Sequence, residues 1–599
     1  MEIKQKKRDE IPIEYKWKLE DLYPTEADWR KDIEAIKSQI EILEKFQGKL
    51  TTGDALANCL NTLFKASEII SRIYVYANLK LHEDTSISAS QAMADTAEST
   101  STKFSAAVSF ITPEILTHDE NTIRNFITTT PELKMYEHYL EDIIRQKAHV
   151  LSAEVEAILA NAAEVGSAAE NIYDMLGSAD MKFGTITDEN GNTVEITHGR
   201  YISLMQSPDR RVRKDAFETY YESFWKLKNA LATMLSSSVK KDIFFAKTRK
   251  YEGTLSAELS GDNIPRSVYD QLIETVHQFL PSMHRYVALR KKALRLDELH
   301  MYDIYTPLAK EADIKMSYAD AKKTVAEGLK PLGKNYITEM EKGMNDRWID
   351  VYENEGKQSG AYAWGAFGGH PYVLLNHNDT IGDMFTLAHE MGHAMHSYYS
   401  WQTQPKVYAS YTIFLAEIAS TVNETLVIDH MLKTTTDQNV RTYLLGEYLE
   451  QFRGTIFRQT MFAEFEMIIH HMAENGEPLT LESLNKVYRD LNIKYYGPDM
   501  IIDEQIDFEW ARIPHFYSSF YVYKYATGYS AAIAFNKRLQ SGDPKVLEDY
   551  INFLKAGSSD YSIEILKKAG IDMNSPAPVH EALTVFDNLV TEMEKALGF

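Results

Sequence analysis

The chain has 599 residues, of which 44% are hydrophobic and 25% are charged, and its formal net charge at pH 7 is −23. This composition is typical of a protein with large buried cores, and no apolar run approaches the roughly 18 residues that a membrane span requires. Because the charge is acidic and no long cluster of Lys and Arg is present, we do not expect nucleic acid as a partner. Because no apolar run is long enough for a span, we do not expect a membrane as a partner either.

The chain contains one cysteine, Cys59, which excludes internal disulfides and cysteine-based metal sites. The first residues, MEIKQKKRDEIPIEYKW, are charged and lack the apolar stretch of a secretory signal. A single cysteine also fits a reducing compartment. We therefore expect a cytoplasmic protein, whose oligomeric state the sequence does not indicate.

Helical and strand-like patterns divide the chain. Residues 26–178 place hydrophobic side chains at helical spacing with short breaks, which predicts a succession of long helices. On either side of Asn190 and Gly191, hydrophobic and polar side chains then alternate with a period of two residues, a pattern typical of a β-hairpin. We therefore predict an N-terminal helical region over residues 1–200 that ends in this hairpin, and a second, mostly helical region over residues 201–599.

The second region also contains short strand-like segments. A short strand is predicted near Met301–Tyr305, and Asp346–Thr380 contains two β-rich runs, WIDVY and PYVLLN, separated by glycines. The latter strands would lie beside the helix that follows them. Two interpretations stay open: the strands pair with an extended peptide, or they form a small sheet that only supports the helix.

That following helix carries an H-E-x-x-H pentad from His389 to His393. Thr380 and Asp383 predict a capping box at its start, and the two histidines, about one turn apart, project from one face. Two imidazoles so placed can bind one Zn²⁺. Glu390 lies beside them and can accept a proton from a water at the metal, so the pattern indicates a metallopeptidase site.

Gly392, inside the pentad, costs about 1 kcal/mol relative to Ala within a helix. A residue without a side chain is understandable where another element must approach the metal closely. We therefore expect a second element to pack against the pentad at this position.

A catalytic zinc site needs a third protein ligand. The metzincin pattern would require Gly at 396 and His at 399, whereas the chain has His396 and Tyr399. Glu417 and Glu424 lie two turns apart on the apolar face of the next predicted helix, where a carboxylate is costly unless paired or metal-bound. We select Glu417 as the ligand and Glu424 as the partner that orients a ligand histidine; the reverse ligand choice and a surface role for Glu424 are the alternatives.

The segment Arg512–Ala532 is dense in aromatic side chains with polar ends. Any single tyrosine in it could belong to the packed interior. As a group, one histidine and one or two tyrosine hydroxyls are the donors that an oxyanion developing opposite Zn²⁺ requires. The candidates are His515, Tyr517, Tyr521, Tyr523, Tyr525 and Tyr529.

Six motifs give the chain a family resemblance. In chain order they are EYKWKLEDLYPTEADW, GHPYVLLNHND, FTLAHEMGHAMHS, FLAEIASTVNE, TIFRQTMFAEFE and RIPHFYSSFYVYKYATGYS. On these motifs the chain resembles the oligoendopeptidase F family, within the thimet-type oligopeptidase group of zinc metallopeptidases. The resemblance spans nearly the whole chain. It implies a mainly α, two-lobed zincin-type fold with a deep central channel and small β elements near the active site.

The resemblance also implies an activity and its residues. It implies a cytoplasmic endopeptidase that cleaves short, unfolded oligopeptides and binds one Zn²⁺ per chain. Carried over by motif, His389, His393 and Glu417 would be the zinc ligands and Glu390 the general base. His515 matches the histidine that stabilises the transition state.

Tyr521 and Tyr525 are our choices for the accompanying tyrosine donors. Two rival hypotheses remain. The first is a peptide-binding or scaffold protein that keeps the fold without activity, and the intact Glu390 argues against it. The second is a carboxypeptidase of related helical fold, which should not cleave peptides that end in a C-terminal amide.

Overall fold

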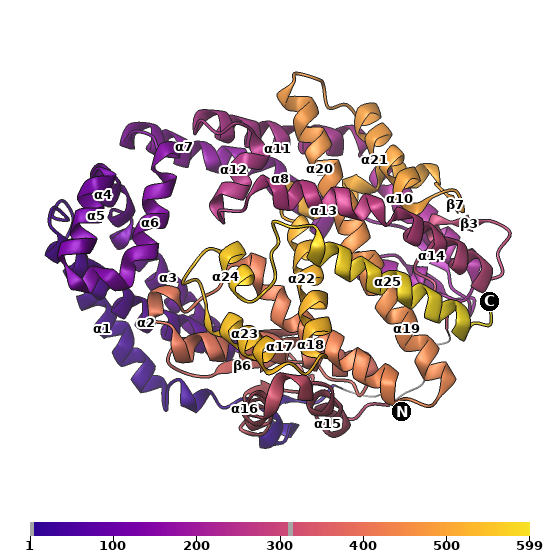
Figure 1. Ribbon diagram of the computed structural model, residues 1–599, viewed down its shortest axis with the longest axis horizontal. Helices are drawn as coiled ribbons and strands as arrows, with labels where there is room; N and C mark the ends of the chain where they lie inside the picture. The colour runs from indigo at the N-terminus through magenta and orange to yellow at the C-terminus, as the bar shows by residue number, and fades with distance from the viewer. Residues whose placement is uncertain (1–4, 310–314) are drawn as a thin grey trace. The chain divides into compact units, whose positions relative to one another are not determined.

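The computed structural model describes residues 5–309 and 315–599, and most of them lie in helices (Figure 1). The prediction of a mainly α fold with small β elements is confirmed. By their contacts the residues fall into two compact units. Unit 1 comprises Met1–Ala148, Ile314–His430 and Phe535–Ile571, and unit 2 comprises His149–Asp313, Met431–Ala534 and Asp572–Phe599. The division near residue 200 along the chain stays a prediction.

Unit 1 is built from helices around one small sheet. Its N-terminal helices start at threonine and aspartate N-caps such as Thr25, Thr52 and Asp119, and they bury one continuous apolar core. The helices are α1 (Glu26–Glu44), α2 (Gly53–Glu83), α3 (Ser88–Val108), α4 (Ile111–Thr117), α5 (Glu120–Thr129), α6 (Glu137–Gln146), α15 (Tyr318–Gly328), α16 (Gly333–Asn345), α17 (Ile381–Thr403), α18 (Ile413–Thr434, its last residues in unit 2), α23 (Pro544–Lys555) and α24 (Ser562–Lys568).

The sheet of unit 1 has the strand order β4-β6-β5. β4 (Ile349–Asp350) runs parallel and β5 (Tyr362–Gly365) antiparallel to the fully buried β6 (Pro371–Leu374). The strands predicted in WIDVY and PYVLLN are therefore confirmed. β6 packs on α17, and Figure 1 shows α17, α23 and β6 side by side. β5 forms one edge of the sheet, where an extended peptide could pair with it, and it also contacts α17, which the sheet supports. Both interpretations of the sheet therefore stay open.

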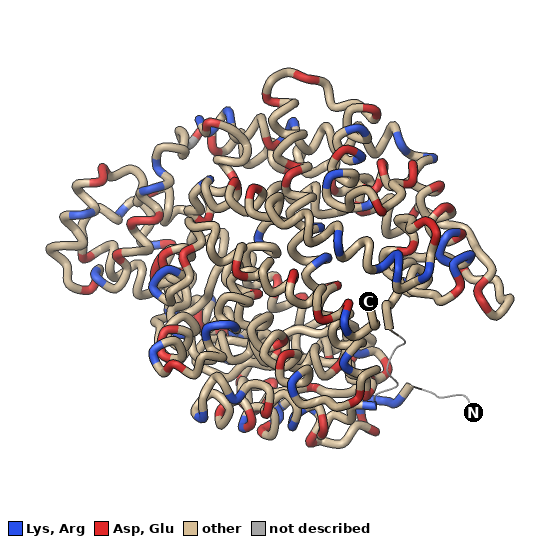
Figure 2. The backbone as a smooth tube through the Cα atoms, turned by 45° about the vertical axis from the view of Figure 1, so that its right-hand side comes forward, with Lys and Arg blue, Asp and Glu red and all other residues tan. Residues whose placement is uncertain are grey.

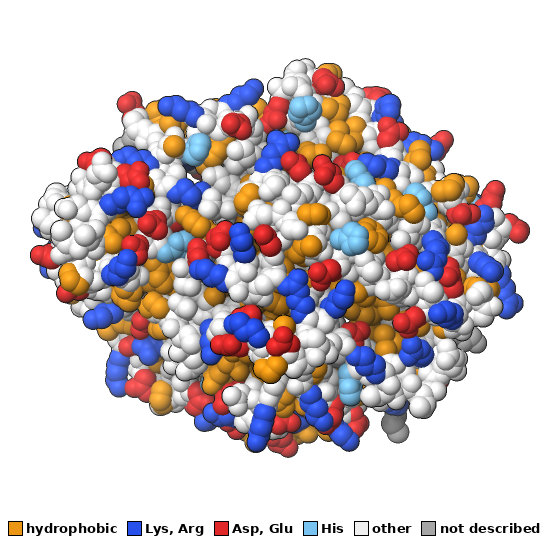
Figure 3. Space-filling model, viewed as in Figure 1, with side chains coloured by type: hydrophobic (Ala, Val, Ile, Leu, Met, Phe, Trp, Pro, Cys, Tyr) orange, Lys and Arg blue, Asp and Glu red, His pale blue; other side chains and the backbone are white. Residues whose placement is uncertain are grey.

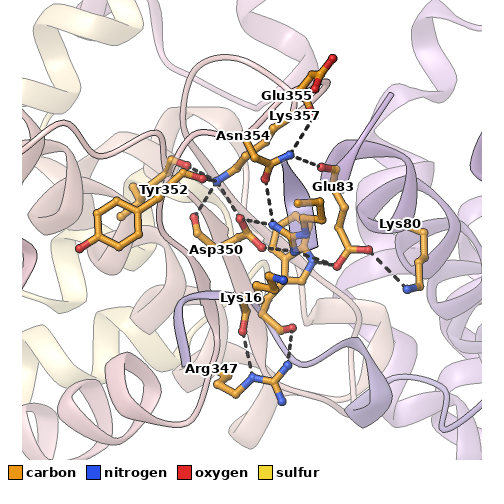
Figure 4. Close-up of polar contacts among 12 residues, drawn as sticks. Lys16, Lys80, Glu83, Arg347, Asp350, Tyr352, Asn354, Glu355 and Lys357 are labelled. Atoms are coloured by element: carbon orange, nitrogen blue, oxygen red, sulfur yellow. Dashed lines mark hydrogen bonds and ion pairs between the residues drawn. The ribbon is translucent and has the colours of Figure 1, made fainter. Parts of the chain in front are cut away.

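A buried charge cluster fixes the loop after β4 (Figure 4). The ammonium of Lys357 lies 2.7 Å from Asp350 Oδ1, and both side chains are fully buried. Lys357 also donates to the backbone oxygens of Tyr352 and Leu375 at 2.7 and 2.6 Å. Arg8 binds the same Asp350 carboxylate and, at 3.0 Å, Glu83 on α2. These bonds tie the N-terminal segment and α2 to the sheet beneath α17.

Unit 2 is also mainly helical, and Figure 1 shows α19 and α25 side by side within it. Its elements are α7 (Ala153–Gly166), α8 (Ala168–Met175), α9 (His198–Met205), α10 (Arg210–Trp225), α11 (Lys228–Thr248), α12 (Thr254–Gly261), α13 (Arg266–Gln278), α14 (Leu280–Ala293), α19 (Gln438–Phe452), α20 (Arg458–Glu474), α21 (Leu481–Tyr496), α22 (Tyr523–Leu539, its last residues in unit 1), α25 (Ala577–Ala596), β1 (Thr185–Thr187), β2 (Thr193–Glu195), β3 (Leu299–His300) and β7 (Met500–Ile501).

Two strand predictions fall in unit 2. The hairpin around Asn190 and Gly191 is confirmed, since β1 and β2 pair antiparallel on either side of these residues. The strand predicted near Met301–Tyr305 lies earlier, at Leu299–His300, where β3 pairs in parallel with β7. The residues that follow form a 3-10 turn because Asp303 accepts the His300 N–H in a capping box.

Acidic and basic residues are interspersed along the backbone in Figure 2, and the face in Figure 3 mixes them with small groups of hydrophobic side chains. The chain therefore distributes its excess of acidic residues rather than collecting it in one segment. Among the described residues, no helix is both long and apolar enough to cross a membrane.

Candidate metal centre

Local sequence fixes the start of α17, the helix that carries the pentad. Thr380 Oγ1 accepts the N–H of Asp383, and the Asp383 carboxylate accepts the N–H of Thr380 in return, so the predicted capping box is confirmed. Three turns of regular helix then separate this cap from the end of the pentad. His389 and His393 therefore share one face, and their ring centroids lie 4.8 Å apart.

Gly392 is the point at which α18 approaches α17. A Cβ atom at this position would lie 2.5 Å from Ser420 Cα and 2.7 Å from the backbone oxygen of Ala419. Real Cβ atoms do not come so close to backbone, so only glycine permits this spacing. Asn423 on α18 donates to the backbone oxygen of Ala388 at 3.0 Å and fixes the same contact. The close approach brings Glu417, one turn before Ser420, to the histidines.

Three side chains converge on one point. The Nε2 atoms of His389 and His393 are 3.1 Å apart, and each lies 3.4 Å from Glu417 Oε2. A tetrahedral Zn²⁺ with ligand distances near 2.0 Å separates its ligands by about 3.3 Å. Two imidazoles and one carboxylate are also a donor set that zinc accepts. The residues present therefore fit a zinc ion, and within the described part of the chain no other group of three His, Cys, Asp or Glu side chains meets the same test.

Supporting contacts orient two of these three side chains. The Nδ1 atom of His389 lies 2.5 Å from Glu424 Oε1, so the carboxylate accepts the Nδ1–H and orients Nε2 toward His393 and Glu417. Ser420 Oγ donates to Glu417 Oε2 at 3.2 Å. The structure thus brings Glu417 to the histidine Nε2 atoms and Glu424 to the far side of the His389 ring.

Glu390 lies in the same helix and is 6% exposed. Its Oε2 atom is buried and, among the described residues, has no hydrogen-bond partner. Burial raises the pKa of Glu390, against the opposing effect of His389 and His393. A carboxylate beside two imidazoles, with one oxygen uncommitted, is suited to take up and release a proton.

The charges of the cluster favour a cation. Burial alone would lower the pKa of His389, but its hydrogen bond to Glu424 and the nearby carboxylates raise it to about 9. Burial would raise the pKa of Glu417, but the two histidines lower it to about 2. The neighbouring carboxylates thus stabilise positive charge at the imidazoles, and a bound divalent metal could take the place of that charge.

The remaining histidines near the sheet and α17 have other contacts. His396 is fully buried and stacks on Tyr411 with ring centroids 3.7 Å apart, and burial lowers its pKa to about 3. His370 stacks on Trp348, and the His377 ring faces the backbone oxygen of Met316 at 3.2 Å. These contacts account for the three side chains as packing groups.

The aromatic segment of unit 2 separates into two sets. His515, Tyr521 and Tyr525 are half-buried and meet one another, with ring centroids 5.3 to 6.1 Å apart. The hydroxyl of Tyr525 lies 3.5 Å from His515 Nε2. Burial, with a contribution from Arg458, lowers the pKa of His515, which favours the neutral imidazole.

The other tyrosines of the segment pack within unit 2. Tyr517 stacks on Tyr173 with ring centroids 4.5 Å apart, and Tyr523 packs on Tyr269 at 5.1 Å. Tyr529 donates to Gln451 at 3.2 Å. The structure therefore distinguishes Tyr521 and Tyr525 from the remaining three.

Sequence reasoning missed two residues of the metal centre, Ser420 and Asn423. Ser420 follows Glu417 by three residues, a spacing at which side chains on a helix meet. This contact could therefore have been predicted from the sequence. Asn423 on α18 donates to the Ala388 backbone oxygen on α17, and no residue near either motif indicates this contact.

Two family models match the chain. Peptidase family M3 matches residues 203–585, and Oligopeptidase F matches residues 114–183. Oligopeptidase PepF of Bacillus subtilis is 47% identical over 592 residues, which cover 98% of this chain and 88% of the relative. Group B oligopeptidase PepB of Streptococcus agalactiae is 40% identical, with 99% of this chain and 98% of the relative covered.

Two solved structures of peptidases are also similar to this chain. A Chlamydophila abortus protein described as a peptidase superposes with a TM-score of 0.94 and 36% identity over 99% of this chain and 100% of the other. Oligoendopeptidase-F from Enterococcus faecium superposes with a TM-score of 0.74 and 39% identity over 95% of this chain and 99% of the other.

Proposed function

Because this chain belongs to peptidase family M3 and is a metalloendopeptidase of the oligoendopeptidase F type, we propose that it uses one Zn²⁺ to cleave internal bonds of short oligopeptides. We extend the proposal to unfolded substrates and to a cytoplasmic location. His389, His393 and Glu417 would hold the metal. When bound, Zn²⁺ would polarise a water and the scissile carbonyl, and it would lower the pKa of the water toward about 7.

Glu390 has the central role among the protein's own groups. Its uncommitted Oε2 atom accepts a proton from the attacking water and then delivers it to the leaving amine, so one carboxylate serves both steps. Glu424 holds the His389 ring in the orientation that presents Nε2. Both tasks require an ionised or hydrogen-bonded carboxylate at a fixed position, which the packing of α17 on α18 supplies.

Charge that develops on the scissile carbonyl oxygen needs donors. We assign this role to His515 with Tyr521 and Tyr525, the half-buried trio of unit 2. An imidazole N–H and phenol O–H groups are neutral donors that gain strength as the oxygen becomes an anion. The neutral state favoured for His515 by burial suits a donor that does not repel a nearby cation.

The single observation that carries the proposal is the spacing of the three ligand atoms. Distances of 3.1 and 3.4 Å among two imidazole nitrogens and a carboxylate oxygen match a tetrahedral zinc, and Glu390 adjoins them in the same helix. A hydrogen bond between the two rings could by itself explain the 3.1 Å distance, but a shared metal ion also explains why one carboxylate oxygen lies 3.4 Å from both nitrogens.

The test uses a ladder of peptides blocked at both ends, from a few residues to a folded domain, with mass spectrometry of the products. Internal cuts in the short peptides that vanish with a chelator and return with Zn²⁺ would support the proposal. Trimming that requires a free C-terminal carboxylate would instead indicate a carboxypeptidase. Tight binding without cleavage by zinc-loaded protein would indicate a binding protein.

A further inference from the structure

The turn between His515 and Tyr525 contains a strained residue. Residues 518–522 join a 3-10 helix, η12 (Pro514–Tyr517), to α22. Within this turn Phe520 has a φ of 57°, in the left-handed region that side chains other than glycine rarely adopt. Such a conformation costs free energy and persists where surrounding contacts determine it. The contacts of this turn therefore set the geometry of the residues it joins.

Two neighbouring residues of the turn are anchored to two different helices of unit 2. The backbone N–H of Phe520 donates to Glu466 Oε1 on α20 at 2.8 Å. The hydroxyl of Ser519 donates to Asp242 Oδ2 on α11 at 2.6 Å. α11 and α20 pack on each other, so the two anchors form one rigid support.

Glu466 is an unusual anchor because, among the described residues, its carboxyl group forms no ion pair. Its side chain is 1% exposed, and its Oε2 atom has no hydrogen-bond partner among the described residues. Burial raises the pKa of Glu466 well above its usual range, against the Phe520 N–H bond, and the carboxylates of Asp242 and Glu258 raise it further. A buried carboxyl in such surroundings is expected to be a neutral acid that accepts one backbone hydrogen bond.

The turn is not close-packed on all sides. A cavity of about 230 Å³ is lined by Ser518–Tyr521 of the turn and by polar side chains of α11 and α12, among them Asp242 and Glu258. On its other side the turn is packed, since Phe520 and Val522 are buried and Phe520 contacts His470 and Tyr269. The hydrogen bonds to Glu466 and Asp242 add a directional constraint to this packing.

We propose that Glu466 is a positioning residue for the peptidase reaction: by accepting the Phe520 N–H, it fixes the turn that presents His515, Tyr521 and Tyr525. The inference rests on the proposed function, since it takes these three side chains as the donors to the oxyanion. Asp242, through Ser519, is the second anchor of the same turn.

The test compares Glu466→Met and Glu466→Gln in the full-length, zinc-loaded protein. Met has a similar volume but no acceptor, whereas Gln keeps a neutral acceptor at the same place. The matched control is Glu464→Met: Glu464 is also buried on α20 but binds His277, Lys494 and Tyr495 and does not touch the turn. Amide hydrogen exchange of residues 515–525 and peptide kinetics are measured on each variant.

The inference predicts that Glu466→Met speeds exchange in the turn and lowers kcat about tenfold to a hundredfold with little change in KM, because the donors are displaced by a fraction of an ångström. Glu466→Gln should keep the wild-type exchange rate of the turn and the wild-type kcat. Glu464→Met should lower the melting temperature but leave the exchange rate of the turn and kcat unchanged. Wild-type exchange and kcat in Glu466→Met would overturn the inference, as would equal damage in Glu466→Gln.

The exchange measurement does not depend on cleavage. If the wild-type protein cuts no peptide, the proposed function fails, while slow exchange in the wild type and fast exchange in Glu466→Met would still establish the anchor. If His515→Ala keeps the wild-type kcat, the donor assignment fails for a reason unrelated to Glu466.

Discussion

Three glutamates of the candidate metal centre have different surroundings, and we propose a different role for each. Glu417 faces two imidazoles, which lower its pKa to about 2 and keep it anionic. Glu390 is buried with one uncommitted oxygen, and burial raises its pKa. Glu424 is bound to the far nitrogen of His389. All three are the same residue type, so only their surroundings differ. These surroundings suit Glu417 to bind a metal, Glu390 to move a proton and Glu424 to orient a ligand.

Glu390→Gln should lower kcat by about a hundredfold to ten-thousandfold, because an amide cannot take the proton from water. KM should change little, since Gln occupies the same volume. Steady-state kinetics on a blocked peptide measures both constants. Glu327→Gln, at an exposed position of α15, is the control and should behave as the wild type. A kcat within threefold of the wild type in Glu390→Gln would remove Glu390 from the mechanism.

Glu424→Gln should weaken zinc binding by about tenfold to a hundredfold, because the Nδ1 atom of His389 loses its charged acceptor. Competition with a chelator of known affinity measures the change. Glu417→Gln, which loses a proposed ligand, should weaken binding more. If the order of the two variants is reversed, Glu424 is the ligand and Glu417 the supporting residue.

At the scale of elements, the centre depends on how closely α18 packs on α17. The pentad supplies two candidate ligands from α17, and the third candidate comes from α18. The distance between the two helix backbones therefore sets the position of the third. Gly392 permits that distance, and the bond from Asn423 to Ala388 holds it. A small change in this contact therefore moves Glu417 relative to both histidines.

Gly392→Ala should push α18 away, since the new Cβ would meet the backbone of Ser420 at 2.5 Å. We expect a loss of about 1–3 kcal/mol in the free energy of unfolding, from overpacking, together with weaker zinc binding. Gly382→Ala is the control in the same helix, because its Cβ would meet only Thr380 Oγ1, at 3.6 Å. The control should be neutral or stabilising. Wild-type stability and zinc affinity in Gly392→Ala would refute this account of the packing.

The sheet beneath α17 depends on the buried pair of Asp350 and Lys357. Asp350→Asn should lower the free energy of unfolding by about 3–5 kcal/mol, because it leaves Lys357 and Arg8 without their carboxylate. The double variant with Asp350→Leu and Lys357→Met removes both buried charges and should recover much of this loss. Urea unfolding of the three proteins measures the difference. Equal destabilisation by the single and the double variant would contradict the argument.

Low pH should weaken the ion pair of Asp350 and Lys357 and so lower the stability of the protein. Burial would raise the pKa of Asp350, but Arg8 and Lys357 hold it below its usual value of 3.8. A carboxylate with a lowered pKa contributes stability that is present above pH 3.8 and is lost as the pH falls through its folded pKa. The stability of the wild-type protein should therefore fall more steeply below pH 3.8 than that of the double variant. Parallel curves in this range would show that Asp350 is not the titrating group.

Local patterns made much of this architecture predictable. The capping box of Thr380 and Asp383, the pentad helix and the hairpin at Asn190 each depend on residues a few positions apart. The left-handed Phe520 and its bond to Glu466 could not be predicted, because the partner lies far away in the sequence and the backbone conformation has no glycine to indicate it. The strand near Met301 was misplaced because a capping box at His300 competes with strand extension.

At the scale of the whole molecule, the residues proposed for one reaction belong to two compact units. The candidate metal ligands and Glu390 belong to unit 1, whereas His515 and its tyrosines belong to unit 2. Each unit combines segments that are far apart in the sequence. Changing His515 therefore tests whether unit 2 contributes to the chemical step.

His515→Ala should lower kcat by about a hundredfold to a thousandfold, because the oxyanion loses a donor. Its zinc content should equal that of the wild type, since no proposed ligand is changed. Kinetics and metal analysis of one preparation provide both values. An unchanged kcat would mean that His515 takes no part in catalysis.

The most direct test of the central claim is the zinc content of the purified chain, measured by elemental mass spectrometry after zinc loading and dialysis. We predict about one zinc per chain in the wild type and in inactive Glu390→Gln, and a markedly lower content in Glu417→Gln. A full complement of zinc in Glu417→Gln, or none in the wild type, would contradict the site described for His389, His393 and Glu417.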